Sequence, residues 1–355
     1  MILLWAGFLA FVLALLALDL GILHRKAHIV SMKEALLTSA LWIALGLAFA
    51  LFVYNGYEQH WLGLGSAVDS VDGAINDGQS ATIKYLTGYI VEKSLSVDNI
   101  FVIAMLFGFF GVPPIYQHRV LFWGIIGALA MRAVMIVVGT ALIVQFHWIL
   151  YVFGGFLIVT AFKMFFMKTG AIDPDQNIVI RTTRRLFPVT SRYHGEHFLV
   201  RAGTPASQES ELPGAAAEPD ESVRRVKPGT LMLTPLALAL VMVEATDLVF
   251  AVDSIPAIFA ITADPFLVFT SNVFAMLGLR SLYFALAGVL TKFRYLKPAL
   301  AMVLLVVGVK MLTATSLKQV LGTYFNFYLL GMILLILTVG IIASLLVPSS
   351  QEKSG

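Results

Sequence analysis

The hydrophobic positions of this chain form long continuous runs separated by shorter polar stretches. A helix needs roughly twenty consecutive apolar residues to cross a bilayer, and runs of that length recur along most of the sequence. They predict transmembrane helices near residues 1–23, 36–54, 86–110, 120–144, 148–167, 235–260, 265–290, 298–316 and 323–347. The pattern therefore predicts about nine spans, interrupted once by a long polar linker at 168–230.

The linker divides into two parts with different patterns. Apolar and polar residues alternate over 178–201, which predicts a short hairpin. Residues 203–230 are rich in Ala, Pro, Glu and Ser, and this composition predicts disorder.

Composition supports the same fold class. The chain is 59% hydrophobic and 13% charged, whereas soluble domains are about 25% charged, so we expect an all-α polytopic membrane protein. It contains no cysteine, which excludes disulfides, thiolate zinc sites and cysteine catalysis. Nothing in the sequence supports nucleic-acid binding, and no GxGD or HExxH motif indicates an intramembrane protease. We therefore expect neither an enzyme nor a prosthetic group.

The distribution of lysine and arginine predicts the orientation. One set of alternate loops holds most of these residues, and the opposite set holds only Lys84 and Lys318 together with an acidic loop at 55–80. Basic loops favour the cytoplasmic side. The linker and the C-terminus are therefore predicted to be cytoplasmic and the N-terminus external.

The two halves on either side of the linker resemble each other. DNIFV at 98–102 aligns with DLVFA at 247–251. An arginine and then a lysine follow at nearly equal spacings in both halves: Arg132 and Lys163 in the first, Arg280 and Lys310 in the second. Because three helices make each repeat, the second repeat enters the membrane from the opposite side, as in many transporters.

The repeats divide the chain into five predicted parts. They are two N-terminal helices with an external loop at 1–85, the first repeat at 86–167, the linker at 168–230, the inverted repeat at 231–316, and the last helix with a short tail at 317–355.

Charged residues inside the spans are the candidate functional groups. VMVEATDLVFAVDSIP at 241–256 holds three acids, each costing at least about 2.5–3.5 kcal/mol at the bilayer centre, and Pro256 is predicted to disturb the helix just beyond them. Their oxygens, with amide and hydroxyl oxygens nearby, suit hard cations such as Mn²⁺, Ca²⁺ or Mg²⁺. The predicted metal ligands are Glu92, Asp98, Asn99, Glu244, Asp247, Asp253 and Asn272.

A second interpretation stays open for the same charges. They could form intramembrane ion pairs that fix the register of the helices, and this interpretation suits the repeat-equivalent bases Arg132, Lys163, Arg280 and Lys310. Asp19, near the end of the first span, could serve a site, cap its helix or reach the membrane surface.

The same residues carry a family resemblance. EATDLVFAVDSIPAIFAITADPFLVFTSNVFAMLGLRSLYF at 244–284 resembles the signature of the bacterial TerC/Alx family of membrane proteins. EKSLSVDNIFVI at 92–103, LDLGILH at 18–24 and TPLALALVMVE at 234–244 resemble its other motifs. The family is associated by name with tellurite resistance, and with manganese export and metal homeostasis. It is similar to the LysE-type transporter superfamily, which is built from three-helix repeats.

The resemblance implies Mn²⁺ as the leading substrate, exported by alternating access with the acidic set as ligands and with protons as a candidate coupling ion. Two alternatives remain. The chain could handle an oxyanion such as tellurite through Arg132 and Arg280, or it could be a metal-delivery or scaffold protein that does not transport. Besides the lipid bilayer, a homo-oligomer or a membrane partner is compatible with the sequence.

Overall fold

The computed structural model describes residues 1–18, 31–146, 148–166, 178–208, 220–286, 295–321 and 325–346. Asp19 and the 209–219 part of the predicted disordered segment lie outside these residues. In chain order the elements are α1 (Ile2–Leu18), α2 (Met32–Glu58), a 3₁₀ turn (Trp61–Gly63), α3 (Gly78–Phe110), α4 (Pro114–Gln145), α5 (Ile149–Phe166), α6 (Ile178–Leu186), β1 (Leu199–Arg201), a 3₁₀ turn (Pro205–Gln208), α7 (Glu221–Arg224), β2 (Leu231–Leu233), α8 (Pro235–Phe259), α9 (Pro265–Met276), α10 (Leu279–Leu286), α11 (Leu296–Leu321) and α12 (Phe325–Leu346).

The prediction of an all-α polytopic membrane protein is confirmed, because every predicted span contains a helix. Within the described residues, seven helical segments are long and apolar enough to cross a membrane, with α9 and α10 counted together. Helix α1 is apolar but has only 17 residues. Helix α3 has 33 residues and carries charged side chains along its length. The number of nine spans and the inverted repeat stay predictions.

The chain forms two compact units, described separately below. Unit 1 comprises residues 1–100, 129–169 and 250–355, and unit 2 comprises residues 101–128 and 170–249.

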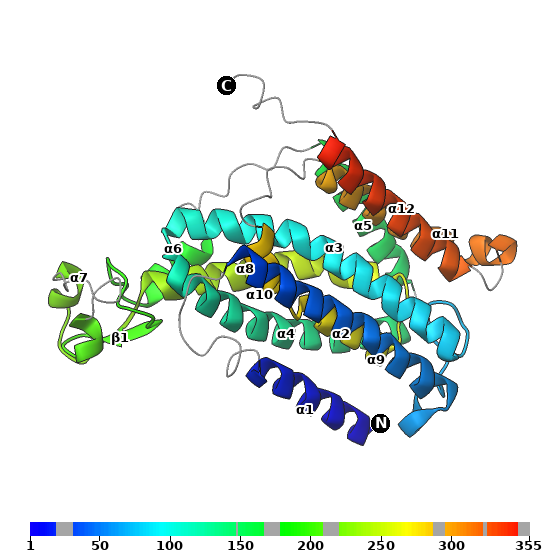
Figure 1. The fold of residues 1–355 in the computed structure, drawn as a ribbon, viewed down its shortest axis with the longest axis horizontal. Helices are drawn as coiled ribbons and strands as arrows, with labels where there is room; N and C mark the ends of the chain where they lie inside the picture. The colour runs from blue at the N-terminus through cyan, green and yellow to red at the C-terminus, as the bar shows by residue number, and fades with distance from the viewer. Residues whose placement is uncertain are drawn as a thin grey trace. The chain divides into compact units, whose positions relative to one another are not determined.

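In unit 1, helices α5, α11 and α12 form one packed group, with α11 contacting both of the others (Figure 1). Two glycines bring α5 and α11 together. A Cβ on Gly154 would lie 2.9 Å from Leu312 Cδ2, and a Cβ on Gly308 would lie 2.9 Å from Ile158 Cγ1. Small residues at such crossings allow close helix packing within a membrane.

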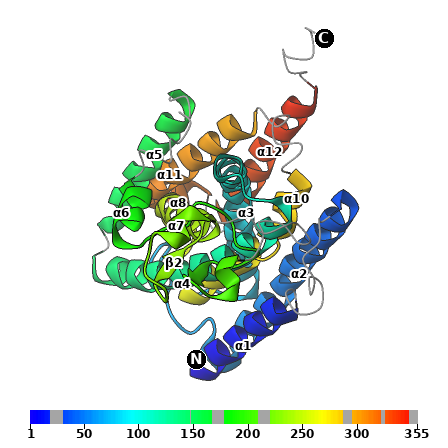
Figure 2. The same ribbon diagram turned by 90° about the vertical axis from the view of Figure 1, so that its left-hand side faces the viewer.

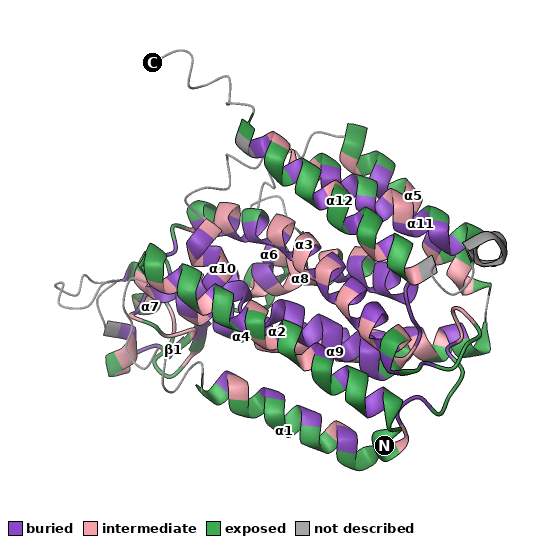
Figure 3. Ribbon diagram, turned by 45° about the vertical axis from the view of Figure 1, so that its right-hand side comes forward, coloured by how far each residue is buried: buried purple, intermediate pink, exposed green. Residues whose placement is uncertain are grey.

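Helices α1, α2, α3 and α4 each contact α9, in which eleven residues from Phe266 to Met276 are buried (Figure 3). Helix α1 lies beside α2 (Figure 2), and Phe8 and Phe49 place their ring centroids 5.7 Å apart. Phe274 of α9 approaches Phe49 to 4.4 Å between centroids. This aromatic cluster fixes α1, α2 and α9 relative to one another.

The break in a membrane helix falls at a different place from the one predicted. Helix α8 runs through Pro256 to Phe259 without interruption. Pro256 removes one intrahelical hydrogen bond because it has no amide hydrogen, and only three residues of α8 follow it. The interruption lies instead between α9 and α10, where Gly278 has φ +81° and a Cβ on it would lie 2.5 Å from Trp42 Cβ. A residue with a side chain would be strained there on both counts.

Unit 2 contains the described parts of the linker, and the prediction of a hairpin over 178–201 is wrong. Residues 178–186 form a helix rather than one arm of a hairpin, and β1 pairs antiparallel with the distant β2. The segments 203–208 and 220–230 contain a 3₁₀ turn and the short helix α7, whereas 209–219 lies outside the described residues, so disorder of the linker stays a prediction. Val200, Ala202 and Met232 form a small buried cluster, and Ala206, Val223 and Val226 pack against it. This apolar burial explains why the described parts of the linker adopt regular structure. The average composition of residues 203–230 does not reveal it.

Candidate functional site

A buried polar group in unit 1 brings together four helices that match predicted spans. Nη1 of Arg132 in α4 donates to Glu92 Oε1 of α3, to Asn272 Oδ1 of α9 at 2.9 Å, and to Ser254 Oγ of α8 at 3.3 Å. All four side chains are at most 2% exposed. We call these four residues the Arg132 centre. Its two charged members, Glu92 and Arg132, lie near the middle of α3 and α4.

The positions of these residues follow from helical spacing and local hydrogen bonds. Asn272 also donates from Nδ2 to the Val268 carbonyl at 2.9 Å, one turn earlier in α9, which fixes its amide with Oδ1 toward Arg132. Glu92 and Ser96 are four residues apart on α3, so they share one face.

That face of α3 carries three buried oxygens without a hydrogen-bond partner among the described residues: Tyr89 Oη, Glu92 Oε2 and Ser96 Oγ. Buried polar atoms are normally hydrogen-bonded, and an unpartnered one calls for an explanation such as a missing ligand or water. The Arg132 centre therefore has spare oxygen ligands beside it.

The other predicted ligands of unit 1 lie apart from this hydrogen-bond network. Asp98 is half-buried, and Lys297 of α11 attracts its carboxylate. Asp253 Oδ1 accepts a hydrogen bond from Thr160 of α5 at 3.2 Å, and the exposed Lys163 attracts the same carboxylate. Asn99 is buried.

Glu244 and Asp247 belong to unit 2, and their surroundings are given within that unit alone. Both are half-buried. Gly127 of α4 faces Glu244 so closely that a Cβ on it would lie 2.0 Å from Glu244 Oε1. The absence of a side chain at Gly127 therefore makes the room for the Glu244 carboxylate.

The remaining bases occupy different environments. Arg280 and Lys310 are buried, and Lys310 Nζ donates to the Ala260 carbonyl at the end of α8. Lys93, which sequence reasoning left without a role, donates to the carbonyls of Ala275 at 3.0 Å and Leu277 at 3.4 Å. Lys93 thus caps the free end of α9 at its interruption, where a positive charge is favourable.

Over the described ranges, no three Asp, Glu or His side chains gather as they would around a bound metal. The oxygens that do gather in unit 1 are of mixed type, comprising one carboxylate, one amide and one hydroxyl around Arg132. Such a set suits a hard cation better than a soft one.

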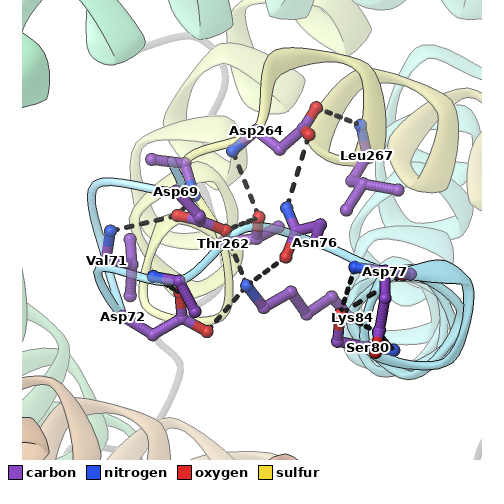
Figure 4. Close-up of polar contacts among 12 residues, drawn as sticks. Asp69, Val71, Asp72, Asn76, Asp77, Ser80, Lys84, Thr262, Asp264 and Leu267 are labelled. Atoms are coloured by element: carbon purple, nitrogen blue, oxygen red, sulfur yellow. Dashed lines mark hydrogen bonds and ion pairs between the residues drawn. The ribbon is translucent and has the colours of Figure 1, made fainter. Parts of the chain in front are cut away.

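A second buried polar cluster was not predicted from the sequence. Lys84 Nζ contacts Asp69 Oδ2 at 2.8 Å, Asp72 Oδ2 at 2.7 Å and Asn76 Oδ1 at 2.6 Å (Figure 4). Asp69 also accepts from the hydroxyl of Thr262 and from the amide of Ala263 at 2.9 Å. We call these residues the Lys84 cluster.

The Lys84 cluster holds the 59–77 loop against the turn between α8 and α9. Burial alone raises the pKa of Asp69, but the attraction of Lys84 and the hydrogen bonds from Lys84, Thr262 and Ala263 outweigh it, so the pKa lies below its usual value. The carboxylate is therefore charged at neutral pH. The acidic 55–80 loop and Lys84 were visible in the sequence, but nothing local indicated Thr262, 193 residues from Asp69.

Comparisons with known proteins agree with the fold. The family model described as "Integral membrane protein TerC family" matches residues 77–352. The Myxococcus xanthus protein named "Uncharacterized membrane protein STKORF319" is 46% identical over 316 residues, covering 89% of this chain and 85% of the relative. Proteins of Salmonella typhi and Escherichia coli strain K12, each named "Putative membrane-bound redox modulator Alx", are 43% identical over 313 and 312 residues, covering 87% of this chain and 85% of each relative. No solved structure matches the chain.

Proposed function

Because the chain belongs to the TerC family of integral membrane proteins, we propose that it carries a hard divalent cation across the bacterial cytoplasmic membrane. Mn²⁺ is the leading substrate and export the proposed direction. The observation that carries the proposal is the Arg132 centre, where a fully buried carboxylate, an amide and a hydroxyl from three helices converge on Arg132 near the middle of α4. Charged groups within transmembrane segments mark ion pathways in membrane proteins.

The acids in the spans divide into two roles in this proposal. Glu92 and Asn272 lie in the Arg132 centre. Asp98, Asp253, Glu244 and Asp247 are half-buried, and they bind the ion on its way or take up protons. Opening of the site to each side in turn completes the cycle, and an inward proton gradient drives export by neutralising carboxylates.

Handling of an oxyanion such as tellurite is less favoured by the geometry. Nη1 of Arg132 faces a carboxylate, an amide oxygen and a hydroxyl, and the carboxylate would repel an anion. The word "redox" in the relatives' name describes those proteins. This chain has no cysteine, so a thiol–disulfide mechanism of its own is excluded.

Flux measurements in proteoliposomes test the proposal. We expect wild-type protein to move Mn²⁺, and we expect Asp98→Asn and Asp247→Asn to lose most of that flux because each removes a charged oxygen ligand. Glu221→Gln is the control, since Glu221 is 79% exposed in the side chain and lies outside every span. An uncoupler should reduce export if protons drive it.

Each alternative gives a different result in the same assay. Full Mn²⁺ binding without flux would favour a scaffold or delivery protein over a transporter. Tellurite movement that survives Asp98→Asn would favour the oxyanion hypothesis and contradict the proposal.

A further inference from the structure

The hydrogen bonds at Arg132 Nη1 do not balance. This nitrogen carries two hydrogens, yet three oxygens from three helices lie around it: Glu92 Oε1, Asn272 Oδ1 at 2.9 Å and Ser254 Oγ at 3.3 Å. One nitrogen therefore occupies a pocket of oxygens that offers more acceptors than it has protons to give.

The Lys84 cluster shows what a balanced buried cation looks like in the same unit. The ammonium of Lys84 has three hydrogens, and three oxygens from Asp69, Asp72 and Asn76 lie 2.6–2.8 Å from it. Donors and acceptors match there, as expected for a purely structural ion pair.

The ion pair between Arg132 and Glu92 is also incomplete on the side of the carboxylate. A structural arginine–carboxylate pair is frequently bidentate, with two parallel hydrogen bonds. Here Nη1 meets Oε1, while Glu92 Oε2 is buried without a hydrogen-bond partner among the described residues, as is Ser96 Oγ on the same face of α3. One carboxylate oxygen and one hydroxyl oxygen beside the ion pair are therefore available to a second cation.

We infer that the Arg132 side chain is a built-in counter-cation that competes with the transported divalent ion for the oxygens of Glu92 and Asn272. This inference rests on the proposed function. Carboxylate, amide and hydroxyl oxygens are ligands of hard divalent cations, and two positive charges that share the same oxygens repel each other. The arriving ion therefore displaces the guanidinium, and when the ion leaves, the guanidinium returns.

The competition has a physical purpose in the cycle. An emptied site would leave Glu92 as an unpaired buried charge, which is strongly unfavourable. The returning guanidinium removes that penalty and so assists release of the ion. Arg132 is a positioning residue in this scheme, and it lowers the affinity for the ion while raising the rate of turnover.

Binding and flux of Mn²⁺ in the Arg132→Gln variant test this inference. We expect Mn²⁺ to bind roughly tenfold more tightly, within the usual range of coupling between competing ligands, and the maximal flux to fall because release loses its assistance. The double variant Glu92→Gln/Arg132→Gln should bind more weakly than wild type, since the carboxylate is gone.

Lys93→Gln is the matched control for charge. It removes one positive charge from the residue next to Glu92 on α3, and the ammonium that is lost donates to the carbonyls of Ala275 and Leu277 rather than to the Arg132 centre. Its Mn²⁺ affinity should stay at the wild-type value. An equal gain of affinity in Lys93→Gln, or no gain in folded Arg132→Gln, would overturn the inference.

A measurement on the wild-type protein covers the case in which Arg132→Gln does not fold. Infrared difference spectra with isotope-labelled arginine should show guanidinium bands that shift on addition of Mn²⁺, and Arg132→Lys should lack these bands. Unshifted bands in a protein that binds Mn²⁺ would refute the competition. If wild-type protein neither binds nor moves Mn²⁺, the proposed function itself fails, and that result is distinct from unchanged affinity in Arg132→Gln.

Discussion

Lys84 is a buried cation whose position depends on oxygens contributed by an irregular loop. Its side chain and that of Asp69 are both fully buried, and Asp72 is 22% exposed. Removing one member of such a pair leaves the other charge uncompensated, and that is more costly than losing the attraction alone. The stability of the contact between the 59–77 loop and the rest of unit 1 therefore depends on the ion pairs of Lys84.

We predict that Lys84→Met lowers the free energy of unfolding by about 3–5 kcal/mol, because Asp69 stays buried without its counter-charge. Adding Asp69→Asn to that variant should recover part of the loss. The control is Arg225→Met, whose ion pair with Glu221 is 79% exposed on both sides and should change stability by less than about 1 kcal/mol. Unfolding in mixed micelles measures all three, and equal losses for Lys84→Met and Arg225→Met would contradict the prediction.

At the level of single residues, the sequence predicted the candidate site residues but not which of their side chains form hydrogen bonds with one another. Glu92 and Asn272 could be singled out because charged and amide side chains are costly in an apolar run. Their common contact with Arg132 joins residues 40 and 140 positions apart, and such distant pairing leaves no local trace. Whether these residues and the half-buried acids bind a metal stays a prediction.

Among the elements, helix positions were predictable and their interruption was not. Apolar runs locate α2, α4, α5 and α12 because the bilayer sets their length. The break between α9 and α10 depends on Gly278 and on Lys93, which reaches two carbonyls of the broken end from another helix. A glycine inside an apolar run is common in membrane helices, so Gly278 alone did not reveal the break.

Adjacent glycines in α5 give a direct test of the packing between α5 and α11. A Cβ on Gly154 would lie 2.9 Å from Leu312 Cδ2, whereas a Cβ on Gly155 meets nothing within 4 Å. We predict that Gly154→Leu separates the two helices and costs roughly 1–3 kcal/mol through overpacking, while Gly155→Leu is nearly neutral. Thermal unfolding of purified protein compares them, and similar melting of the two variants would argue against this helix contact.

On the scale of the whole molecule, contacts within unit 1 agree with a chain that crosses the membrane repeatedly. The amino group of Met1 donates to the Leu62 carbonyl at 2.9 Å, and the 59–77 loop contacts the turn between α8 and α9 through Asp69. The charge pattern predicts all three segments on the external side, and the structure gathers them at one end of the unit. Which end faces the cytoplasm rests on the lysine and arginine bias alone.

Single cysteines decide the orientation, because the natural chain has none. We predict that Ile75→Cys, at a side chain 58% exposed in the 59–77 loop, reacts with a membrane-impermeant maleimide in spheroplasts. Arg225→Cys, in the linker, should react only after permeabilisation. The reverse pattern would invert the predicted topology.

The pairing of β1 with β2 has a consequence for how this protein can vary. Leu199 lies opposite Leu233, and the Thr234 hydroxyl donates to the His197 carbonyl at 2.7 Å, one residue before α8 begins. The pairing of the two strands holds Arg201 and Leu231 side by side, so the chain between them is an insertion whose two ends lie together. Because the strand pairing sets where α8 starts, residues can be gained or lost within this insertion without shifting the helix that carries Glu244 and Asp247. A further domain could therefore be inserted between β1 and β2 without changing the position of α8.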